Sequence, residues 1–152
     1  PTPIDSDILI ELREILGPET NTFSLFCQTE KSYGCAYAID TELNFKDNSF
    51  DITFTEILTE GACATVVVPA STSINLSALK NGSYDIALNN GKLKNAGTLT
   101  ITDTKAELKV NGQNGIKITN PALERIPANT YWGLIGYSSA DQISKIKYFL
   151  DK

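Results

Sequence analysis

The feature that most constrains this chain is a stretch from 73 to 110 in which apolar and polar residues alternate on both sides of an Asn-Gly pair. Tyr84, Ile86 and Leu88 alternate with polar or small residues, and the alternation resumes beyond Asn90-Gly91. Alternation with a period of two buries one face of a sheet and leaves the other in water. Asn-Gly favours a type I′ hairpin turn, because both central residues of that turn need positive φ. The stretch therefore predicts antiparallel strands.

Shorter runs of the same kind extend this pattern along the chain. The period becomes helical only near the C-terminus, where Ser139 and Gln142 have the spacing of a capping box. The predicted elements are strands at 23–27, 35–45, 50–57, 62–68, 115–119 and 130–137, turns at 30–34, 46–49 and 103–104, a loop or helical turn at 120–127, and a helix at 139–151. We therefore predict an all-β fold, an antiparallel Ig-like β-sandwich on which the C-terminal helix packs.

The first 16 residues are harder to assign. Residues 1–7 carry two prolines and several turn formers, which predicts a leader or linker before a single domain at 8–152. The segment 8–16 has apolar residues at positions that fit one stripe of a helix and also one face of a strand. The all-β context favours the strand.

Charge and hydropathy exclude two classes of partner. The net charge is −5 and arginine occurs only at positions 13 and 125, so the chain lacks the basic surface that a nucleic-acid backbone requires. The longest apolar runs, such as 64–68, are too short to span a membrane. We expect no cofactor. A chain with no Met that starts Pro-Thr-Pro is expected to be a mature or trimmed product.

Three cysteines leave several pairings open. A small β domain with several cysteines is typical of exported proteins that carry a disulfide, which here would leave one odd thiol. Cys35 with Cys63 is the preferred pair, because each stands at the start of an apolar run that neighbouring strands would bring together. Cys27 with Cys35 across a short hairpin is the alternative, and three free thiols in an intracellular protein is another.

Part of the chain resembles a known class of module. The motif Ile74-x-Leu76-x-x-Leu79-x-Asn81-Gly82-x-Tyr84-x-Ile86, followed by Gly97-Thr98-Leu99-x-Ile101-Thr102-Asp103, is similar to one found in Ig-like and fibronectin-like modules of bacterial secreted and surface proteins. The resemblance covers about a quarter of the chain. It implies a β-sandwich that is exported by a bacterium, and it implies no particular ligand. The length of the chain and the added helix depart from a plain Ig module.

Catalytic groups are scarce in this sequence. The absence of histidine excludes Ser-His-Asp and Cys-His catalysis within the chain. Carboxylates remain: Asp40 and Glu42 alternate onto one face of a strand, and Glu56 and Glu60 flank the turn before Cys63. Such a pair is what a glycosidase needs. A solvated strand face explains the same residues and is the favoured interpretation.

Two weaker binding sites are suggested by residue type. Asp47 and Asp51 lie in a turn whose oxygen atoms would suit Ca²⁺, although turn chemistry explains them equally well. Tyr131, Trp132 and Tyr137 would form a platform for stacking a sugar if the aromatic rings are exposed. The alternative is that Trp132 is a core residue.

These observations favour a non-catalytic β-sandwich module at a bacterial cell surface or in the periplasm, which binds a protein or glycan partner or acts as a structural spacer. A carboxylate-dependent glycan hydrolase is the alternative from another class, and a cleft holding two carboxyl groups of raised pKa would identify it. A protein inhibitor is a further alternative, identified by a disulfide-braced protruding loop after Cys27 or near Pro127. The sequence leaves the oligomeric state open.

Overall fold

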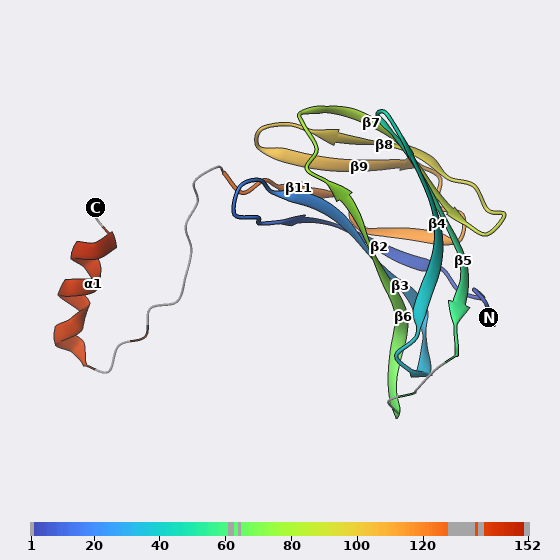
Figure 1. The fold of residues 1–152 in the computed structure, drawn as a ribbon, viewed down its shortest axis with the longest axis horizontal. Helices are drawn as coiled ribbons and strands as arrows, with labels where there is room; N and C mark the ends of the chain where they lie inside the picture. Colours follow the sequence, from blue (N-terminus) through green and yellow to red (C-terminus); the bar gives the residue numbers. More distant parts are fainter. Residues whose placement is uncertain (1, 61–62, 64, 128–135, 137–138, 151–152) are drawn as a thin grey trace.

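The computed structural model describes residues 2–60, 63, 65–127, 136 and 139–150, and its strands belong to one mixed sheet (Figure 1). Neighbours in the sheet follow the order β10-β2-β3-β6-β4-β5-β7-β8-β9-β11, and β1 pairs with β5 outside that path. The strands are β1 (Thr2–Pro3), β2 (Ile8–Ile15), β3 (Thr22–Cys35), β4 (Ala38–Lys46), β5 (Ser49–Leu58), β6 (Thr65–Ser77), β7 (Gly82–Asn90), β8 (Ala96–Ile101), β9 (Lys105–Asn111), β10 (Ile116–Asn120) and β11 (Ala122–Glu124).

The predicted antiparallel Ig-like β-sandwich is wrong, because this one sheet curls until it is nearly closed into a barrel (Figure 1). Two long junctions are parallel: β5 with β7, where Phe50 lies opposite Ile86, and β10 with β2, where Ile116 lies opposite Ile8. Parallel neighbours are far apart in sequence, so no turn residues between them mark the pairing. Period-two alternation is the same on the strands of a sandwich and of a barrel, so it does not distinguish the two folds.

One side of the barrel is closed by a segment that changes partner halfway along. β10 pairs with the first half of β2, and β11 directly after it pairs with β9 at the far end of the sheet. Pro121 lies at the change, where it has no N–H to donate and its carbonyl accepts a hydrogen bond from the Leu108 amide at 2.7 Å. The Glu14 carboxylate of β2, only 3% exposed, accepts hydrogen bonds from Arg125 Nε at 3.2 Å and from the Ile126 amide at 2.9 Å. These contacts join the two ends of the sheet.

Apolar residues at alternate positions fill the barrel. Ile8, Ile10 and Leu12 of β2 are fully buried, which confirms the strand interpretation of the 8–16 segment. Other large side chains that are fully buried include Phe23, Leu25, Ile52, Phe54, Ile57, Leu76, Leu88, Leu99 and Ile101. The period-two pattern therefore correctly identifies the inner face of the sheet.

Two segments that the sequence predicts as breaks between strands are themselves part of strands. The turn predicted at 30–34 lies within β3, where the pairing with β6 shifts register between Gln28 and Ser32. Thr29 holds this irregularity: its hydroxyl accepts a hydrogen bond from the Ala70 amide at 3.0 Å and donates one to the Lys31 carbonyl at 2.7 Å. Because Glu30, Lys31 and Ser32 are polar and exposed, they imitate a turn in the sequence. The loop or helical turn predicted at 120–127 contains β11.

The hairpins agree more closely with prediction. The turn at 103–104 is confirmed, with the Thr102 amide donating to the Lys105 carbonyl at 2.9 Å. The turn at 46–49 is confirmed between β4 and β5. The Asn-Gly turn is shifted by one residue: Asn90 and Leu93 exchange both backbone hydrogen bonds at 3.0 Å, so Gly91, with φ of +56°, is the first central residue. Glycine at that position is the requirement of a type II′ turn.

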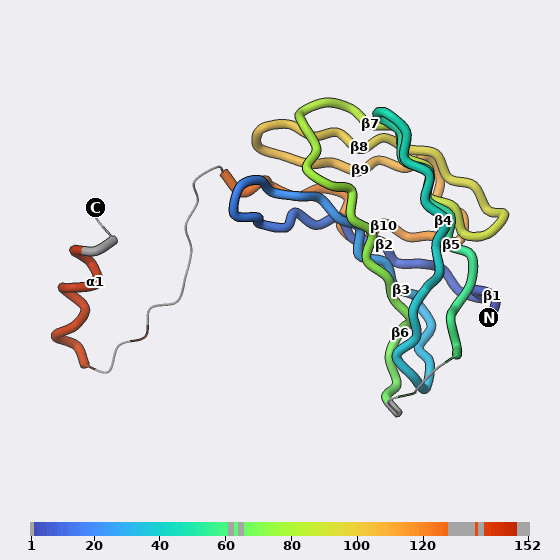
Figure 2. The backbone as a smooth tube through the Cα atoms, in the orientation of Figure 1, coloured from blue at the N-terminus to red at the C-terminus, as the bar shows by residue number. Residues whose placement is uncertain are grey.

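The two ends of the chain differ in their relation to the barrel. At the N-terminus, β1 lies inside the segment predicted as a leader or linker, and Thr2 pairs with Ile57 of β5. The C-terminal helix is present as a 3₁₀ turn, η1 (Ala140–Gln142), followed by α1 (Ile143–Leu150). In Figures 1 and 2, α1 lies apart from the barrel, so the predicted packing of the helix on the sheet is not seen. The strand predicted at 130–137 lies outside the described residues except for Gly136.

Replacing Glu14 with Gln tests the closure of the barrel. The substitution removes the charge that faces Arg125 and puts an amide N–H where an acceptor is needed, so we expect the free energy of unfolding to fall by about 2–4 kcal/mol. Glu11→Gln is the matched control, because Glu11 lies on the same strand and pairs with Arg13 at 2.6 Å in an exposed position. Its expected effect is below about 0.5 kcal/mol. Urea denaturation measures both variants, and equal losses would contradict the closing role of Glu14.

Candidate functional site

Among the described residues, one junction of the sheet is almost unpaired, between β4 and β6. The two strands run parallel and share a single pair, Ala38 opposite Ser71, where the Ser71 amide donates to the Tyr37 carbonyl at 3.1 Å. Beyond it, residues 40–46 of β4 and 72–77 of β6 have no ladder partner on their facing edges within the described chain. Figure 2 shows the two strands diverging from this point. We call these two edges the seam.

Apolar side chains of the inner face are exposed at the seam. Leu43 pairs with buried Ile52 and Phe45 pairs with buried Phe50, and directly opposed residues point to the same face of a sheet. The Phe45 and Phe50 rings meet edge to face, with their centroids 5.0 Å apart. Yet Leu43 is 50% exposed and Phe45 is 42% exposed. The seam thus uncovers part of the apolar interior of the barrel.

The outer face of β4 beside the seam carries two acidic residues, Asp40 and Glu42, and one lysine, Lys46, at its far end. Asp40 and Glu42 both lie exposed on β4, at alternate positions as the sequence predicted. Asp40 accepts a hydrogen bond from the Thr55 hydroxyl at 3.1 Å, and neither carboxylate forms an ion pair within the described part of the chain. The seam therefore has an apolar inner rim at Leu43 and Phe45 and an outer rim that is negatively charged around Asp40 and Glu42.

A shallow groove of about 400 Å³ lies elsewhere, between residues 3–7 and the turn at 90–93. It contains two carboxylates, each held by a lysine: Asp5 by Lys31 at 2.5 Å and Asp7 by Lys117 at 3.3 Å. The hydrogen bond from the Lys31 ammonium lowers the pKa of Asp5 below its usual value. A general acid of a glycosidase needs the opposite shift, so this groove does not supply the cleft expected of a hydrolase.

The two predicted calcium residues lie on different elements. Asp47 lies in the β4–β5 turn with φ of +50°, and Asp51 lies on β5, where it accepts a hydrogen bond from Asn89 Nδ2 at 2.8 Å. No group of three or more acidic or cysteine side chains gathers as a metal site in the part of the chain that the structure describes. The predicted sugar platform of Tyr131, Trp132 and Tyr137 lies outside the described residues.

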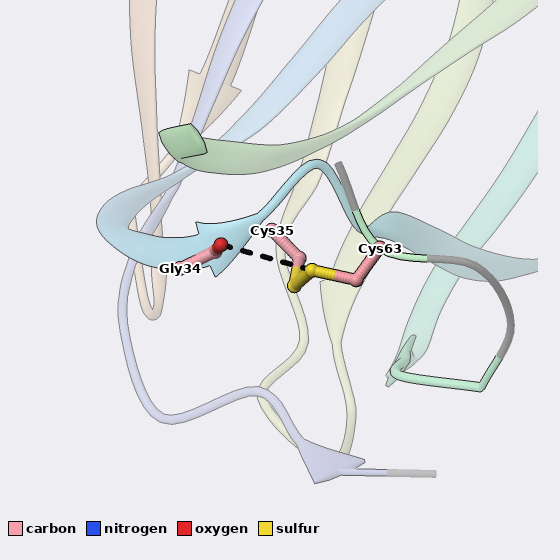
Figure 3. The surroundings of a disulfide bond; sticks show 3 residues. All are labelled: Gly34, Cys35 and Cys63. Atoms are coloured by element: carbon pink, nitrogen blue, oxygen red, sulfur yellow. Dashed lines mark hydrogen bonds between the residues drawn. A yellow bond between two sulfur atoms is a disulfide. The ribbon is translucent and has the colours of Figure 1, made fainter. Parts of the chain in front are cut away.

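The preferred disulfide is confirmed. Cys35 and Cys63 are bonded, with their Cα atoms 5.5 Å apart, and Cys63 Sγ lies 3.8 Å from the Gly34 carbonyl oxygen (Figure 3). The bond joins the end of β3 to a residue just before β6, so the 28-residue span it closes contains the whole β4–β5 hairpin. It thereby restrains the hairpin at the end of the seam where β4 and β6 still pair.

Cys27 is the free thiol. It is fully buried on β3, and burial raises the pKa of this thiol far above its usual value. A thiol that stays protonated and inaccessible is unreactive. Cys27 is therefore a core residue.

Comparisons of the chain with protein-family models, with curated protein sequences and with solved structures found no match. The resemblance to Ig-like and fibronectin-like modules therefore stays a prediction about relatedness, and the sandwich that it implied is replaced by the barrel. No helix in the described part of the chain has the length and hydropathy needed to span a membrane.

Sequence reasoning missed the seam as a site. Leu43 and Phe45 follow the same alternation as the buried residues of neighbouring strands, so the pattern predicts burial for them. Their exposure arises from the missing pairing between β4 and β6, which joins strands that are not adjacent in sequence. A signal was present in the acidic side chains that interleave with them, since charges are typical of edge strands.

Removing the disulfide should destabilise the fold. Because the bond closes a 28-residue span, the double substitution Cys35→Ser and Cys63→Ser should lower the free energy of unfolding by about 3–4 kcal/mol. Guanidinium denaturation with and without a reductant measures this. The reductant should lower the stability of the native protein to that of the variant and leave the variant unchanged; a native protein indifferent to reductant would contradict the bond.

Thiol counting tests the assignment of all three cysteines. Native protein should show no thiol that reacts with an aromatic disulfide reagent, because Cys27 is buried and its pKa is raised. Denaturation should expose one thiol, and denaturation with prior reduction should expose three. One fast-reacting thiol in the native protein would contradict the buried position of Cys27.

Proposed function

We propose that this protein is a non-catalytic exported module that binds an extended segment of a protein partner along the seam. The proposal rests on two features that occur together at the seam: two unpaired strand edges, and the exposed apolar side chains of Leu43 and Phe45 on the inner face. Unpaired edges accept main-chain hydrogen bonds from an added strand, and alternate side-chain positions give specificity. A bacterial surface or the periplasm is the location we propose.

Other features support a binding role. The chain has no histidine, and Asp40 and Glu42 lie on an exposed strand face. The disulfide gives weak support for an oxidising compartment. It braces the base of the β4–β5 hairpin, whereas the inhibitor alternative needs a braced loop that protrudes by itself. No observation on the described residues favours the hydrolase or the sugar platform.

The test uses nine-residue peptides selected for binding to the full chain from a random displayed library. We expect Leu43→Asp to weaken the selected peptides at least about tenfold, because it places a charge on the apolar rim of the seam. Leu93→Asp is the matched control, since Leu93 is also 50% exposed but lies in the turn after β7. Fluorescence anisotropy gives the dissociation constants, and thermal unfolding verifies that both variants fold.

Comparison with the Leu93→Asp control shows where the peptides bind. Equal affinity of the native protein and Leu43→Asp for every selected peptide would overturn the proposal, as would a library that yields no binder. Loss of binding in Leu93→Asp alone would place the site at the shallow groove.

A further inference from the structure

We infer that the seam selects an extended segment in which apolar residues alternate with basic ones, and that this segment runs antiparallel to both β4 and β6. The inference rests on the function proposed above and specifies the chemistry of the partner. It follows from three properties of the seam: the direction of its strands, the faces of their side chains and the charge of the outer rim.

The direction of the bound segment follows from the arrangement of the strands. β4 and β6 are parallel to each other, so a strand between them is antiparallel to both or parallel to both. Antiparallel pairs are more frequent in proteins and slightly more stable per residue. The free edge of β6 is suited to this pairing: the Ser71 amide points toward β4, so by alternation the amides of Ser73 and Asn75 point into the seam. At about 3.3 Å per residue, the open edges accommodate a segment of about six residues.

Side-chain chemistry follows from the two faces of β4. Every second side chain of the added strand lies on the inner face beside Leu43 and Phe45, where an apolar group removes exposed apolar surface from water. The intervening side chains lie on the outer face beside Asp40 and Glu42. Opposite charges in neighbouring strands attract and like charges repel, so basic residues fit these positions and acidic residues do not.

The same charges argue against a second copy of this chain as the occupant. The chain carries a net charge of −5, and each copy would bring the same acidic rim to the contact. Self-association therefore works against long-range repulsion, whereas a basic segment is drawn toward the seam.

The experiment compares three synthetic nine-residue peptides on the full chain. One alternates Val and Lys, one alternates Val and Glu, and one has the Val and Lys residues in two blocks. We expect the Val-Lys peptide to bind at least about tenfold more tightly than the other two, with an affinity that falls as salt is raised. When it binds, hydrogen exchange should show new protection of those amides in 40–46 and 72–77 that point into the seam and have no partner on β5 or β3.

Two variants separate this inference from the proposed function. In Asp40→Asn with Glu42→Gln, the preference for the Val-Lys peptide over the Val-Glu peptide should shrink at least about threefold, because the two carboxylates that attract lysine are removed. Equal binding of these two peptides to the native protein, with both lost in Leu43→Asp, would overturn the charge inference and leave the proposed function standing. Val-Lys binding that is unchanged in Leu43→Asp would overturn both. Protection of the amides that point into the seam, such as those of Ser73 and Asn75, before any peptide is added would also overturn the inference. It would assign the seam to a second copy in a dimer and to the chain itself in a monomer.

Discussion

Closure of the barrel depends on the hydrogen bonds that the buried carboxylate of Glu14 accepts. This carboxylate accepts hydrogen bonds from Arg125, from the Ile126 amide and from Asn21 Nδ2 at 3.1 Å. A buried charge is tolerated only when such partners satisfy it. Arg125 also donates to the Thr102 carbonyl at 2.9 Å, so one ion pair ties β2 to the segment after β11 and to the turn between β8 and β9. The weakest pairing between successive strands of the sheet lies elsewhere, between β4 and β6, which share a single residue pair.

Register shifts on both sides of the seam help to explain why it stays open. The β3–β6 pairing shifts near Gln28 and the β4–β5 pairing shifts between Asp40 and Thr41. The extra residues lie on β3 and β5, the strands that flank β6 and β4, and such irregularities bend a strand and increase its twist. Charged residues on β4 act in the same sense as bulges, because both discourage non-specific pairing of an exposed edge. A strand edge beside negative charges can still bind a segment of opposite charge. The same charged residues therefore protect the edge from aggregation and make it selective for a partner.

Local signals in the sequence predict the strands of this protein well and their arrangement poorly. Alternation identifies the buried faces of β2, β5 and β7, and turn residues place the hairpin at 103–104. The parallel junctions, the change of partner at Pro121 and the contact between Glu14 and Arg125 leave no such signal, because each joins residues far apart in the chain; Glu14 and Arg125 are separated by 111 positions. Glu14 also lies in a run with Glu11 and Arg13, whose side chains are 39% and 46% exposed, so nothing local distinguishes its burial.

The disulfide connects the stability of the fold with the proposed binding at the seam. Cys35 and Cys63 close the span that contains the β4–β5 hairpin, and β4 forms one edge of the seam. Strand addition requires both edges to be ordered, and ordering a backbone costs about 1–2 kcal/mol per residue when it is otherwise free. A covalent restraint at the base of the hairpin reduces that cost before the partner arrives. The seam is thus better prepared for a partner when the bond is formed.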